Sequence, residues 1–382
     1  MKIKSLLLGS AAALVAVSGA RAADAIIVAE PEPVEYVRVC DAFGTGFFYI
    51  PGTETCLRIH GYVRFDVFGG DLFARTSLVD ETYNVNSRLS LRTSTASETE
   101  LGTLRTYTET RFNFNTSDVS FFGTDIGYTN DTTVSLNFAW IQLGGLRVGK
   151  DESFFTTWTG YAGAVINDTP LGGYGPFDTN LISYTYNGGA FRAGIALEQG
   201  VDNTAVFNFA TGDIEPSGWG IDDYMPHVVV GLGATFGMVD LSAVAAWDSR
   251  DDLLLFGNLF ERGGWAGKIR ADVAFNDAFS VFAMLMYGEN SSAYTTWSNG
   301  VADDETFAVV GGFSYAFSEK ASLNTQIDWV DGGAGVDDAW ALTANVAYEL
   351  VPGLVITPEI QYVDAGDDAE DFGAGIRVQR SF

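Results

Sequence analysis

Histidine is scarce in this sequence. The 382 residues include only two histidines, His60 and His227, although histidine is the residue that enzymes use most often to move protons. The G-x-S-x-G motif, which presents a nucleophilic serine in many hydrolases, does not occur in the sequence. An enzyme is therefore a disfavoured hypothesis, His60 is expected to line a polar face, and the sequence predicts no catalytic residue, no metal site and no cofactor.

The basic residues have a spacing that suits the electrostatic selection of solutes. Within short segments they are separated by even numbers of residues, as are Arg58 and Arg64, so they share one face of a β-strand. For each arginine alone, a solvated or locally paired charge is an equally good interpretation. The basic residues predicted for one water-facing wall are Arg58, Arg64, Arg88, Arg92, Arg105, Arg111, Arg147, Arg192, Lys268, Arg270 and Arg377.

Carboxylates occur in the longest polar connection of the chain, residues 151–179. Four of them, Asp151, Glu152, Asp168 and Asp178, are candidates for the side of a water-filled passage that faces the arginines. Opposed rows of acidic and basic side chains would create a transverse electric field, which admits small polar solutes and disfavours apolar ones. This chemistry is electrostatic and requires no covalent step.

The elements that must position these charges are β-strands whose two faces meet different surroundings. In residues 57–67 the odd positions are apolar or glycine, whereas the even positions are Arg, His, Tyr, Arg and Asp. This alternation with a period of two is typical of a strand with one face in water. About sixteen segments are candidates, and an even number suits a closed antiparallel barrel. The candidates are 57–67, 85–95, 104–114, 134–140, 146–150, 180–186, 191–198, 227–236, 239–248, 265–273, 279–287, 307–317, 323–329, 340–350, 354–362 and 371–382.

The connections between these segments alternate between short turns and long polar loops. Short turns include Gly144–Gly145 and Pro352–Gly353, and bacterial outer-membrane barrels have short periplasmic turns and long external loops. A barrel of about sixteen strands is too wide to be filled by its own side chains, so a water-filled lumen is predicted. We expect residues 151–179 to fold inward as a constriction loop. The other long connections are 68–84, 115–131, 199–225, 249–261, 288–305, 330–337 and 363–370.

Aromatic residues near the ends of the candidate strands predict a girdle at the membrane boundary. Trp140, Trp247, Trp329, Tyr348 and Tyr362 have this position, and amphipathic rings favour the headgroup region. For any single ring, ordinary core packing is an equally good explanation. A soluble β-sandwich is the rival architecture, but its strands are usually shorter.

The final candidate strand ends on an aromatic residue. Ile376, Val378 and Phe382 share one face of it, and a terminal aromatic of this kind resembles the signal that outer-membrane assembly machinery recognises. Two residues fit the pattern poorly. Pro358 lies inside a candidate strand and lacks a backbone donor, and Arg380 shares the outward face, where it would snorkel to the interface or contact another subunit.

The amino terminus has the order of a secretory signal peptide. Lys2 and Lys4 precede an apolar stretch over 6–17, and Ala20–Arg21–Ala22 gives a small-residue cleavage pattern. The alternative, an uncleaved membrane anchor, would need a longer apolar run. The expected organisation is a signal peptide over 1–22, a periplasmic segment over 23–56 and a barrel over 57–382.

Composition and cysteine content limit the possible partners. The net charge of −28 disfavours nucleic acid. Cys40 and Cys56 are the only cysteines, and in an exported chain such a pair predicts a disulfide, with two free thiols as the alternative. Acidic clusters such as Asp303–Asp304–Glu305 fall in predicted external loops. They are interpreted as a solvated surface or as carboxylates that hold divalent cations against lipopolysaccharide phosphates.

The segment VCDAFGTGFFYIPGTETCLRIHGYVRFD, residues 39–66, resembles the opening of the alphaproteobacterial, Rhizobiales-type general porins. The leader, the AEPEPVEYV stretch at 29–37 and the terminal QRSF extend this resemblance over the chain, whereas the middle loops match only in kind. The resemblance implies a homotrimer of sixteen-stranded outer-membrane barrels with an inward third loop. It also implies passive diffusion, a Cys40–Cys56 bridge in the periplasmic segment, assembly by the barrel machinery, and contact with outer-membrane lipid and lipopolysaccharide.

Two rival functions are compatible with the sequence. The chain could be an adhesive or structural barrel whose loops bind a host or phage surface. It could instead be a substrate-specific channel, for instance for sugars, whose usual device is a line of aromatic residues along the passage. The alternation of the strands places no such line on the predicted lumen face.

Overall fold

The computed structural model describes residues 38–73, 83–121, 124–202, 204–208, 213–298, 304–333, 337–366 and 370–382. Contacts divide the chain into Met1–Arg38 and a compact unit of Val39–Phe382. Only the second unit is described below, because the predicted signal peptide over 1–22 lies outside the described residues. Among the described residues, no helix is long and apolar enough to cross a membrane.

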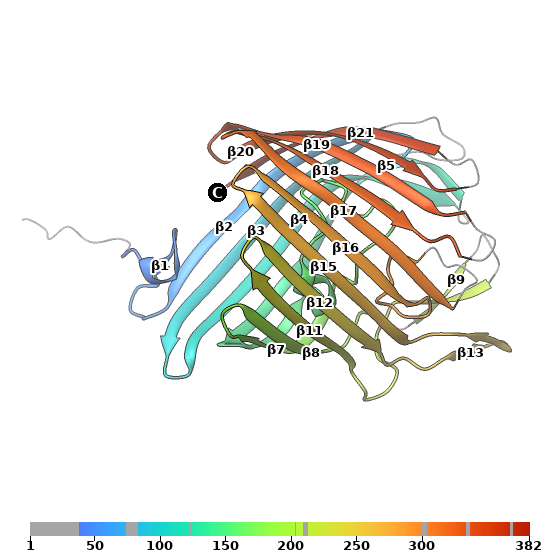
Figure 1. The fold of residues 1–382 in the computed structure, drawn as a ribbon, viewed down its shortest axis with the longest axis horizontal. Helices are drawn as coiled ribbons and strands as arrows, with labels where there is room; N and C mark the ends of the chain where they lie inside the picture. The colour runs from blue at the N-terminus through green and yellow to red at the C-terminus, as the bar shows by residue number, and fades with distance from the viewer. Residues whose placement is uncertain are drawn as a thin grey trace, which may run out of the picture. The chain divides into compact units, whose positions relative to one another are not determined.

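The second unit is a closed barrel of sixteen strands, each antiparallel to its neighbours (Figure 1). The first strand, β2, pairs with the last, β21, from Tyr62–Ser381 to Gly70–Gly373, which closes the wall. Each of the sixteen predicted segments is one strand of this wall, so the predicted fold class is confirmed. In order around the wall they are β2 (Cys56–Gly70), β3 (Tyr83–Thr99), β4 (Gly102–Phe121), β5 (Thr124–Leu143), β6 (Leu146–Asp151), β7 (Thr179–Asn187), β8 (Phe191–Glu198), β11 (His227–Phe236), β12 (Val239–Asp248), β15 (Gly264–Asn276), β16 (Phe279–Glu289), β17 (Glu305–Ser318), β18 (Ala321–Val330), β19 (Ala339–Val351), β20 (Leu354–Asp364) and β21 (Glu370–Ser381).

Smaller elements lie in the connections. Before the barrel are the 3-10 helix η1 (Asp41–Phe43) and the short strand β1 (Phe48–Tyr49), which pairs with β2. The Cys40–Cys56 disulfide joins this region to the start of β2, with the two Cα atoms 6.1 Å apart. The remaining elements are helix α2 (Phe154–Thr159) and the hairpins of β9 (Thr204–Asn208) with β10 (Asp213–Ser217) and of β13 (Leu253–Leu255) with β14 (Asn258–Phe260).

One predicted loop is wrong, because β4 and β5 extend far beyond their predicted ends. Residues 115–131 were expected to form a connection, yet the two strands pair as far as Phe121–Thr124. This stretch is rich in Thr, Ser, Asn and Asp. Threonine favours strands, but polar residues occur at both alternating positions of this stretch, so hydrophobic alternation does not detect it.

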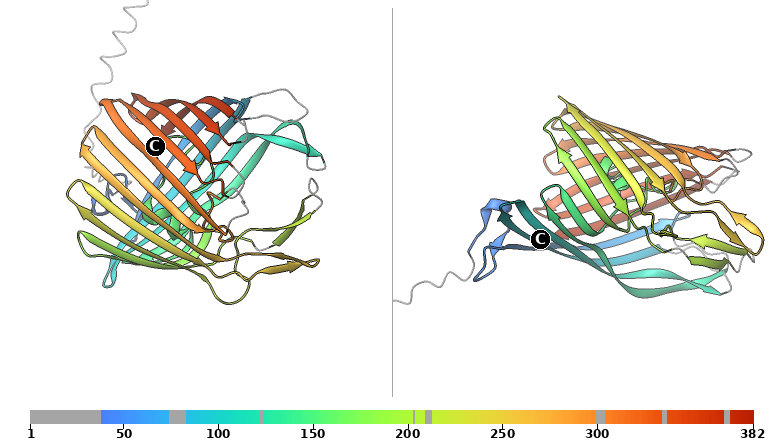
Figure 2. Two further views of the ribbon diagram at one scale, coloured as in Figure 1. Left: turned by 45° about the vertical axis from the view of Figure 1, so that its right-hand side comes forward. Right: turned by 90° about the horizontal axis from the view of Figure 1, so that it is seen from below.

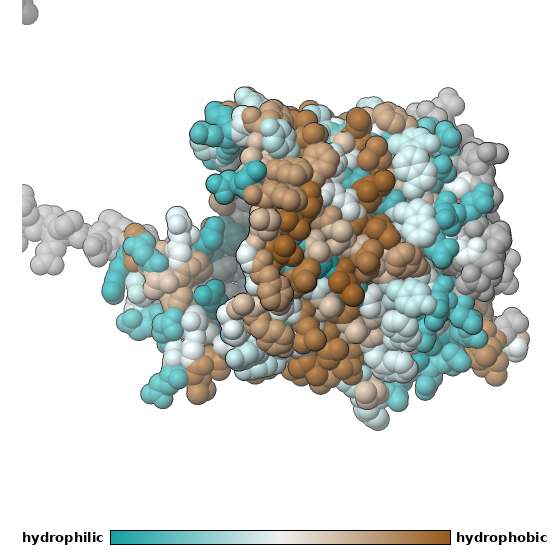
Figure 3. Space-filling model, viewed as in Figure 1, coloured by the Kyte–Doolittle hydropathy of each residue, from teal (hydrophilic) through white to brown (hydrophobic). Residues whose placement is uncertain are grey.

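The outer surface of the wall is apolar and is bounded by rings. Ile59 on β2 is 54% exposed outside the barrel, whereas its inward neighbour Tyr62 is 5% exposed. Figure 3 shows a band of apolar side chains over the face of β12 and β15–β18. A row of outward rings crosses seven adjacent strands, with centroids 5.5 Å apart for Trp265 and Tyr287, and 5.8 Å apart for Phe307 and Trp329. The row comprises Trp247, Trp265, Tyr287, Phe307, Trp329, Trp340 and Tyr362.

Trp140 does not belong to the girdle, because a β-bulge reverses the direction of its strand's side chains. Glu109 of β4 pairs with Phe138 of β5, but the next residue, Thr110, pairs with Leu136. The residue between them, Asn137, has no partner on β4, and an extra residue of this kind shifts the alternation by one. Trp140 therefore faces the lumen.

The two misfitting residues are accommodated locally. Around Pro358, the β19–β20 ladder stops at Asn345–Glu359 and resumes at Tyr348–Ile356, as expected where a backbone donor is missing. The outward Arg380 donates from Nη1 to the carbonyl oxygen of Pro352, 2.8 Å away in the adjacent turn.

Candidate functional site

The connection after β6 folds into the barrel and begins with a short helix (Figure 2). Ser153 caps helix α2, because its side-chain oxygen accepts from the backbone N–H of Phe155 at 3.2 Å. The helix ends at Gly160, whose φ of 77° is a left-handed conformation that favours glycine. The loop of residues 151–179 therefore starts with a fixed direction.

Hydrogen bonds hold the loop against one side of the lumen. Glu359 on β20 accepts from the backbone N–H groups of Ile166 and Asn167, the latter at 2.9 Å. Lys268 on β15, which is 1% exposed, donates to the carbonyl oxygen of Tyr174 at 2.6 Å. Further contacts join Trp158 to Leu232, Ala164 to Asn345, Asn167 to Gln361 and Asp168 to Gln326.

The base of the loop is fixed by buried and paired charges. Glu198, at the end of β8, accepts from the hydroxyl groups of Ser153 at 2.9 Å and Tyr294 at 2.8 Å, and from the N–H of Phe154. Two ion pairs with β6 complete this attachment, namely Arg147 with Asp151 at 2.8 Å and Lys150 with Asp178.

A second connection also enters the barrel, although the sequence predicted it to be an external loop. Tyr294 and Trp297 are almost fully buried, and their ring centroids lie 5.4 and 6.5 Å from that of Phe155 on α2. Gly173 of the loop donates its N–H to the carbonyl of Thr296 at 3.0 Å. The signal that could have indicated this packing is a pair of large aromatic residues in a connection that was predicted to be polar.

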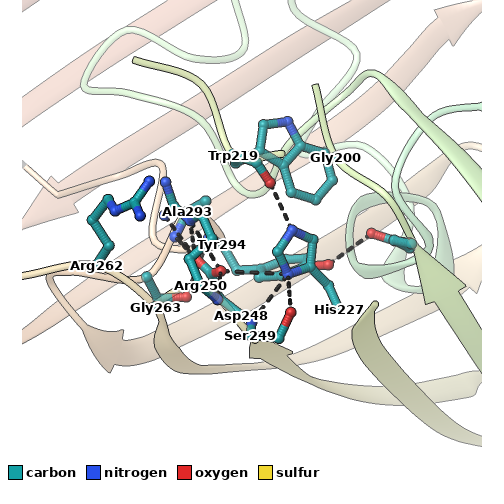
Figure 4. A network of polar contacts seen from close by, with 12 residues as sticks. Gly200, Trp219, His227, Asp248, Ser249, Arg250, Arg262, Gly263, Ala293 and Tyr294 are labelled. Carbon is teal, nitrogen blue, oxygen red and sulfur yellow. Dashed lines mark hydrogen bonds and ion pairs between the residues drawn. The ribbon is translucent and has the colours of Figure 1, made fainter. Parts of the chain in front are cut away.

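Both histidines of the sequence form hydrogen bonds that have a structural role. Figure 4 shows His227, which is fully buried, between the carbonyl of Trp219, 2.6 Å from Nε2, and the N–H of Ser249, 3.1 Å from Nδ1. The adjacent Asp248 pairs with Arg250 at 2.7 Å. Because both ring nitrogens contact backbone groups, His227 links external connections of the barrel. His60 lies on the lumen face, 3.3 Å from Ser94 Oγ.

Some of the predicted basic residues form a continuous group on β2, β3, β4 and β21. Arg92 and Arg111 flank Glu109 at 2.9 and 2.6 Å, and Arg377 pairs with Asp66 at 2.7 Å. With Arg64 and Arg88 they make up the arginine wall. Arg64 donates to Gln379 at 2.9 Å and Arg88 donates to Asn113 at 2.6 Å.

The structure places the other basic candidates differently. Lys268 lies beneath the loop and not on an open wall, because its ammonium group binds the Tyr174 carbonyl. Arg192 and Arg270 form local pairs with Asp240 and Asp272, both at 2.7 Å. Arg147 is paired at the base of the loop, and Arg58 and Arg105 lie on the periplasmic parts of β2 and β4.

Arginines of the wall act on the pKa of two of the four predicted carboxylates. Burial raises the pKa of Glu152, as do the charges of Asp151 and Asp178, whereas Arg111 across the lumen lowers it. Burial likewise raises the pKa of Asp168, against the hydrogen bond from Tyr174 and the charge of Arg377. Asp151 and Asp178 are used in ion pairs at the base of the loop. Within the described ranges, no group of three or more metal-ligating side chains is present.

A closed sixteen-stranded antiparallel barrel, with an inward loop that carries carboxylates opposite arginines, defines an outer-membrane diffusion channel. A model of the porin subfamily matches residues 24–380, and the chain belongs to this porin family. The resemblance noted from residues 39–66 is therefore confirmed, as are the outer-membrane location and the expectation that the chain is not an enzyme.

Similar proteins support this assignment over the whole chain. The chain is 50% identical to "Porin Omp2b" of Brucella suis over 402 residues, with both sequences fully covered. Among solved structures, it resembles the outer-membrane channel DcaP of Acinetobacter baumannii, with a TM-score of 0.64, 18% identity, and coverage of 87% of this chain and 99% of that one. It also resembles Salmonella typhi OmpF, with a TM-score of 0.59, 14% identity, and coverage of 86% and 98%. These two structures share the fold.

Proposed function

We propose that small hydrophilic solutes and ions diffuse through this general porin between the inward loop and the arginine wall, with Glu152 and Asp168 facing the arginines. The observation that carries the proposal is the one-sided attachment of the loop. Apart from its base on β6, its hydrogen bonds to the wall named above go to strands between β8 and β20. The space beside β2, β3 and β4 is left for solutes.

The charges on the two sides of this passage select solutes by polarity. Water between Glu152 and Arg111 is oriented by the field, so a solute must replace ordered water with its own dipole. An apolar solute cannot do so, whereas an ion or a sugar can. Arg64, Arg88 and Arg92 extend the positive side along adjacent strands.

Export and assembly follow from the two ends of the chain. We propose that residues 1–22 direct export and that residues 23–56 are a periplasmic segment closed by the Cys40–Cys56 bridge. Phe382 is 56% exposed on the outer face and exchanges two backbone hydrogen bonds with Gly61, both 3.0 Å. Its exposure at the seam between β2 and β21 suits recognition by the assembly machinery.

A homotrimer is the proposed assembly. On the outer face of β3 and β4, hydroxyl pairs replace aliphatic side chains, with Thr93 and Thr108 2.5 Å apart and Thr95 and Thr106 2.6 Å apart. Hydroxyl groups are costly to place in hydrocarbon, so this face suits contact with another copy of the chain, with lipid and lipopolysaccharide around the remainder. A mass of three chains in mild detergent is expected, and a stable monomer would contradict the assembly.

Liposome swelling tests the diffusion role. Proteoliposomes of the mature chain are placed in neutral sugars of increasing size, and swelling rates are followed by light scattering. A general porin should admit sugars in order of size, irrespective of their stereochemistry. If one sugar enters faster than smaller ones, the channel is substrate-specific, and if no sugar enters, an adhesive or structural role is favoured.

A further inference from the structure

The bulge in β5 creates an aromatic surface inside the lumen that the strand pattern did not predict. Because of it, Phe138 and Trp140 face inward beside Tyr107 of β4. The ring centroid of Tyr107 lies 5.4 Å from that of Trp140, 5.6 Å from that of Phe138 and 6.3 Å from that of His60. All four rings are partly exposed to the lumen.

Cationic groups lie over aromatic rings on this part of the lumen wall. The guanidinium of Arg147 lies 4.2 Å from the Trp140 ring centroid, and Arg92 and Arg64 lie 5.2 and 4.6 Å from that of Tyr62. Registers place the groups in successive rows across the wall. His60, Arg92, Glu109 and Phe138 form one row, and Arg58, Ser94, Tyr107 and Trp140 form the row on its periplasmic side.

We propose that this surface, defined by His60, Tyr107, Phe138 and Trp140 with Arg92, Arg111 and Arg147, is a binding site for small organic anions that carry a flat ring. We name it the arginine–aromatic strip. The proposal rests on the diffusion function, because it specifies which solutes are retained as they pass. A flat ring stacks on Tyr107 or Trp140 in an offset arrangement, and its carboxylate accepts hydrogen bonds from a guanidinium group.

The charge of the strip favours this class of solute over neutral sugars. Three guanidinium groups face two carboxylates, because Arg92 and Arg111 share Glu109 and Arg147 binds Asp151, so the strip keeps a positive excess. A carboxylate on the solute therefore enters a field of the opposite sign, which an uncharged sugar does not experience. Because the strip extends over successive rows, a bound anion has neighbouring positions to move to, as conduction requires.

Block of the ion current by matched carboxylates tests the proposal. Benzoate and cyclohexanecarboxylate have the same charge and similar size but differ in the flatness of the ring. Each is added to single channels of the full mature chain in a planar bilayer. Benzoate should reduce the current at about a two- to tenfold lower concentration, the range expected from one stacked aromatic pair. Equal concentrations for the two anions would overturn the proposal, and this comparison needs no variant.

Variants locate the site. Trp140→Leu should reduce the preference for benzoate, Tyr107→Phe should keep it because the ring is retained, and Trp247→Leu on the outer girdle is the matched control. If Trp140→Leu and Trp247→Leu leave the preference equally unchanged in conducting channels, the strip is not the site. A chain that does not conduct at all would contradict the diffusion function itself, whereas a conducting chain without ring preference contradicts only this inference.

Discussion

The carboxylate of Glu152 is partly buried, which disfavours its charged form, and its charge acts on the solute passage. Its pKa is raised mainly by burial, and Asp151 and Asp178 add to this effect. Arg111 supplies the opposing charge across the passage. The hydroxyl of Tyr161, on the same loop, donates to Glu152 and fixes its direction. Ion selectivity should therefore respond to the protonation of this residue.

The first prediction concerns pH. Because the pKa of Glu152 is raised above the ordinary glutamate value of 4.5, the group loses its negative charge on acidification at a pH above 4.5. The arginines keep their charge, so cation preference should fall as pH decreases towards 4.5. Reversal potentials in a KCl gradient measure this shift. Glu152→Gln should remove it, while Asp277→Asn, in a turn outside the lumen, should not. Identical pH curves for the Glu152→Gln variant and the unmodified chain would refute the role.

At the scale of elements, the loop is positioned by hydrogen bonds between segments that are far apart in the sequence. Glu359 lies on β20, nearly two hundred positions from Ile166 and Asn167, whose N–H groups donate hydrogen bonds to it. Such long-range hydrogen bonds fix the loop because buried donors must be paired. Removal of this acceptor should loosen the constriction without opening the barrel.

The second prediction therefore concerns Glu359→Ala. Two partly buried N–H groups would lose their partner, at a cost of at most about 1–3 kcal/mol each. We expect larger fluctuations of the open-channel current, with the folded barrel retained in gel-shift assays. Glu319→Gln, in an exposed periplasmic turn, is the control. Unchanged current noise in the Glu359→Ala channel would show that the loop is held without this residue.

The strands could be predicted from the sequence, whereas several details that shape the lumen could not. The period of two identified all sixteen strands, because lipid and water impose it along each membrane-crossing segment. The period of two failed at Asn137, where one extra residue in β5 exchanges the inward and outward faces of the strand. Trp140 was therefore predicted to lie on the wrong face. The period could not detect the outer parts of β4 and β5, where polar residues occur at both alternating positions.

The candidate site was predicted as a set of residue types and not as a geometry. The four acidic residues of the loop were equivalent in the sequence, but Arg147 and Lys150 neutralise Asp151 and Asp178. Likewise, the burial of Lys268 depends on where the loop crosses β15. Such pairings arise only after distant strands are brought together, so a sequence pattern does not contain them.

At the scale of the whole molecule, one strand pairing and one disulfide fix the start of the barrel. Hydrogen bonds between β2 and β21 close the barrel, and the disulfide attaches the preceding segment to β2.

The third prediction is that Cys40→Ser with Cys56→Ser lowers stability by about 3 kcal/mol, the value for a crosslink that closes a loop of about 15 residues. The temperature at which the folded band disappears on gels should decrease, and conductance should persist. A variant with unchanged thermal stability would contradict this prediction.

Conductance of single channels in a planar bilayer tests the central claim most directly. The mature chain is purified, shown to be folded by its heat-dependent gel mobility, and recorded under a salt gradient. The structure predicts large, ohmic and repeated current steps, grouped in threes if the trimer is correct, with a reversal potential that moves towards anion preference in Glu152→Gln. A folded, heat-modifiable protein that inserts into the bilayer and carries no current would contradict the assignment of this barrel as an open channel.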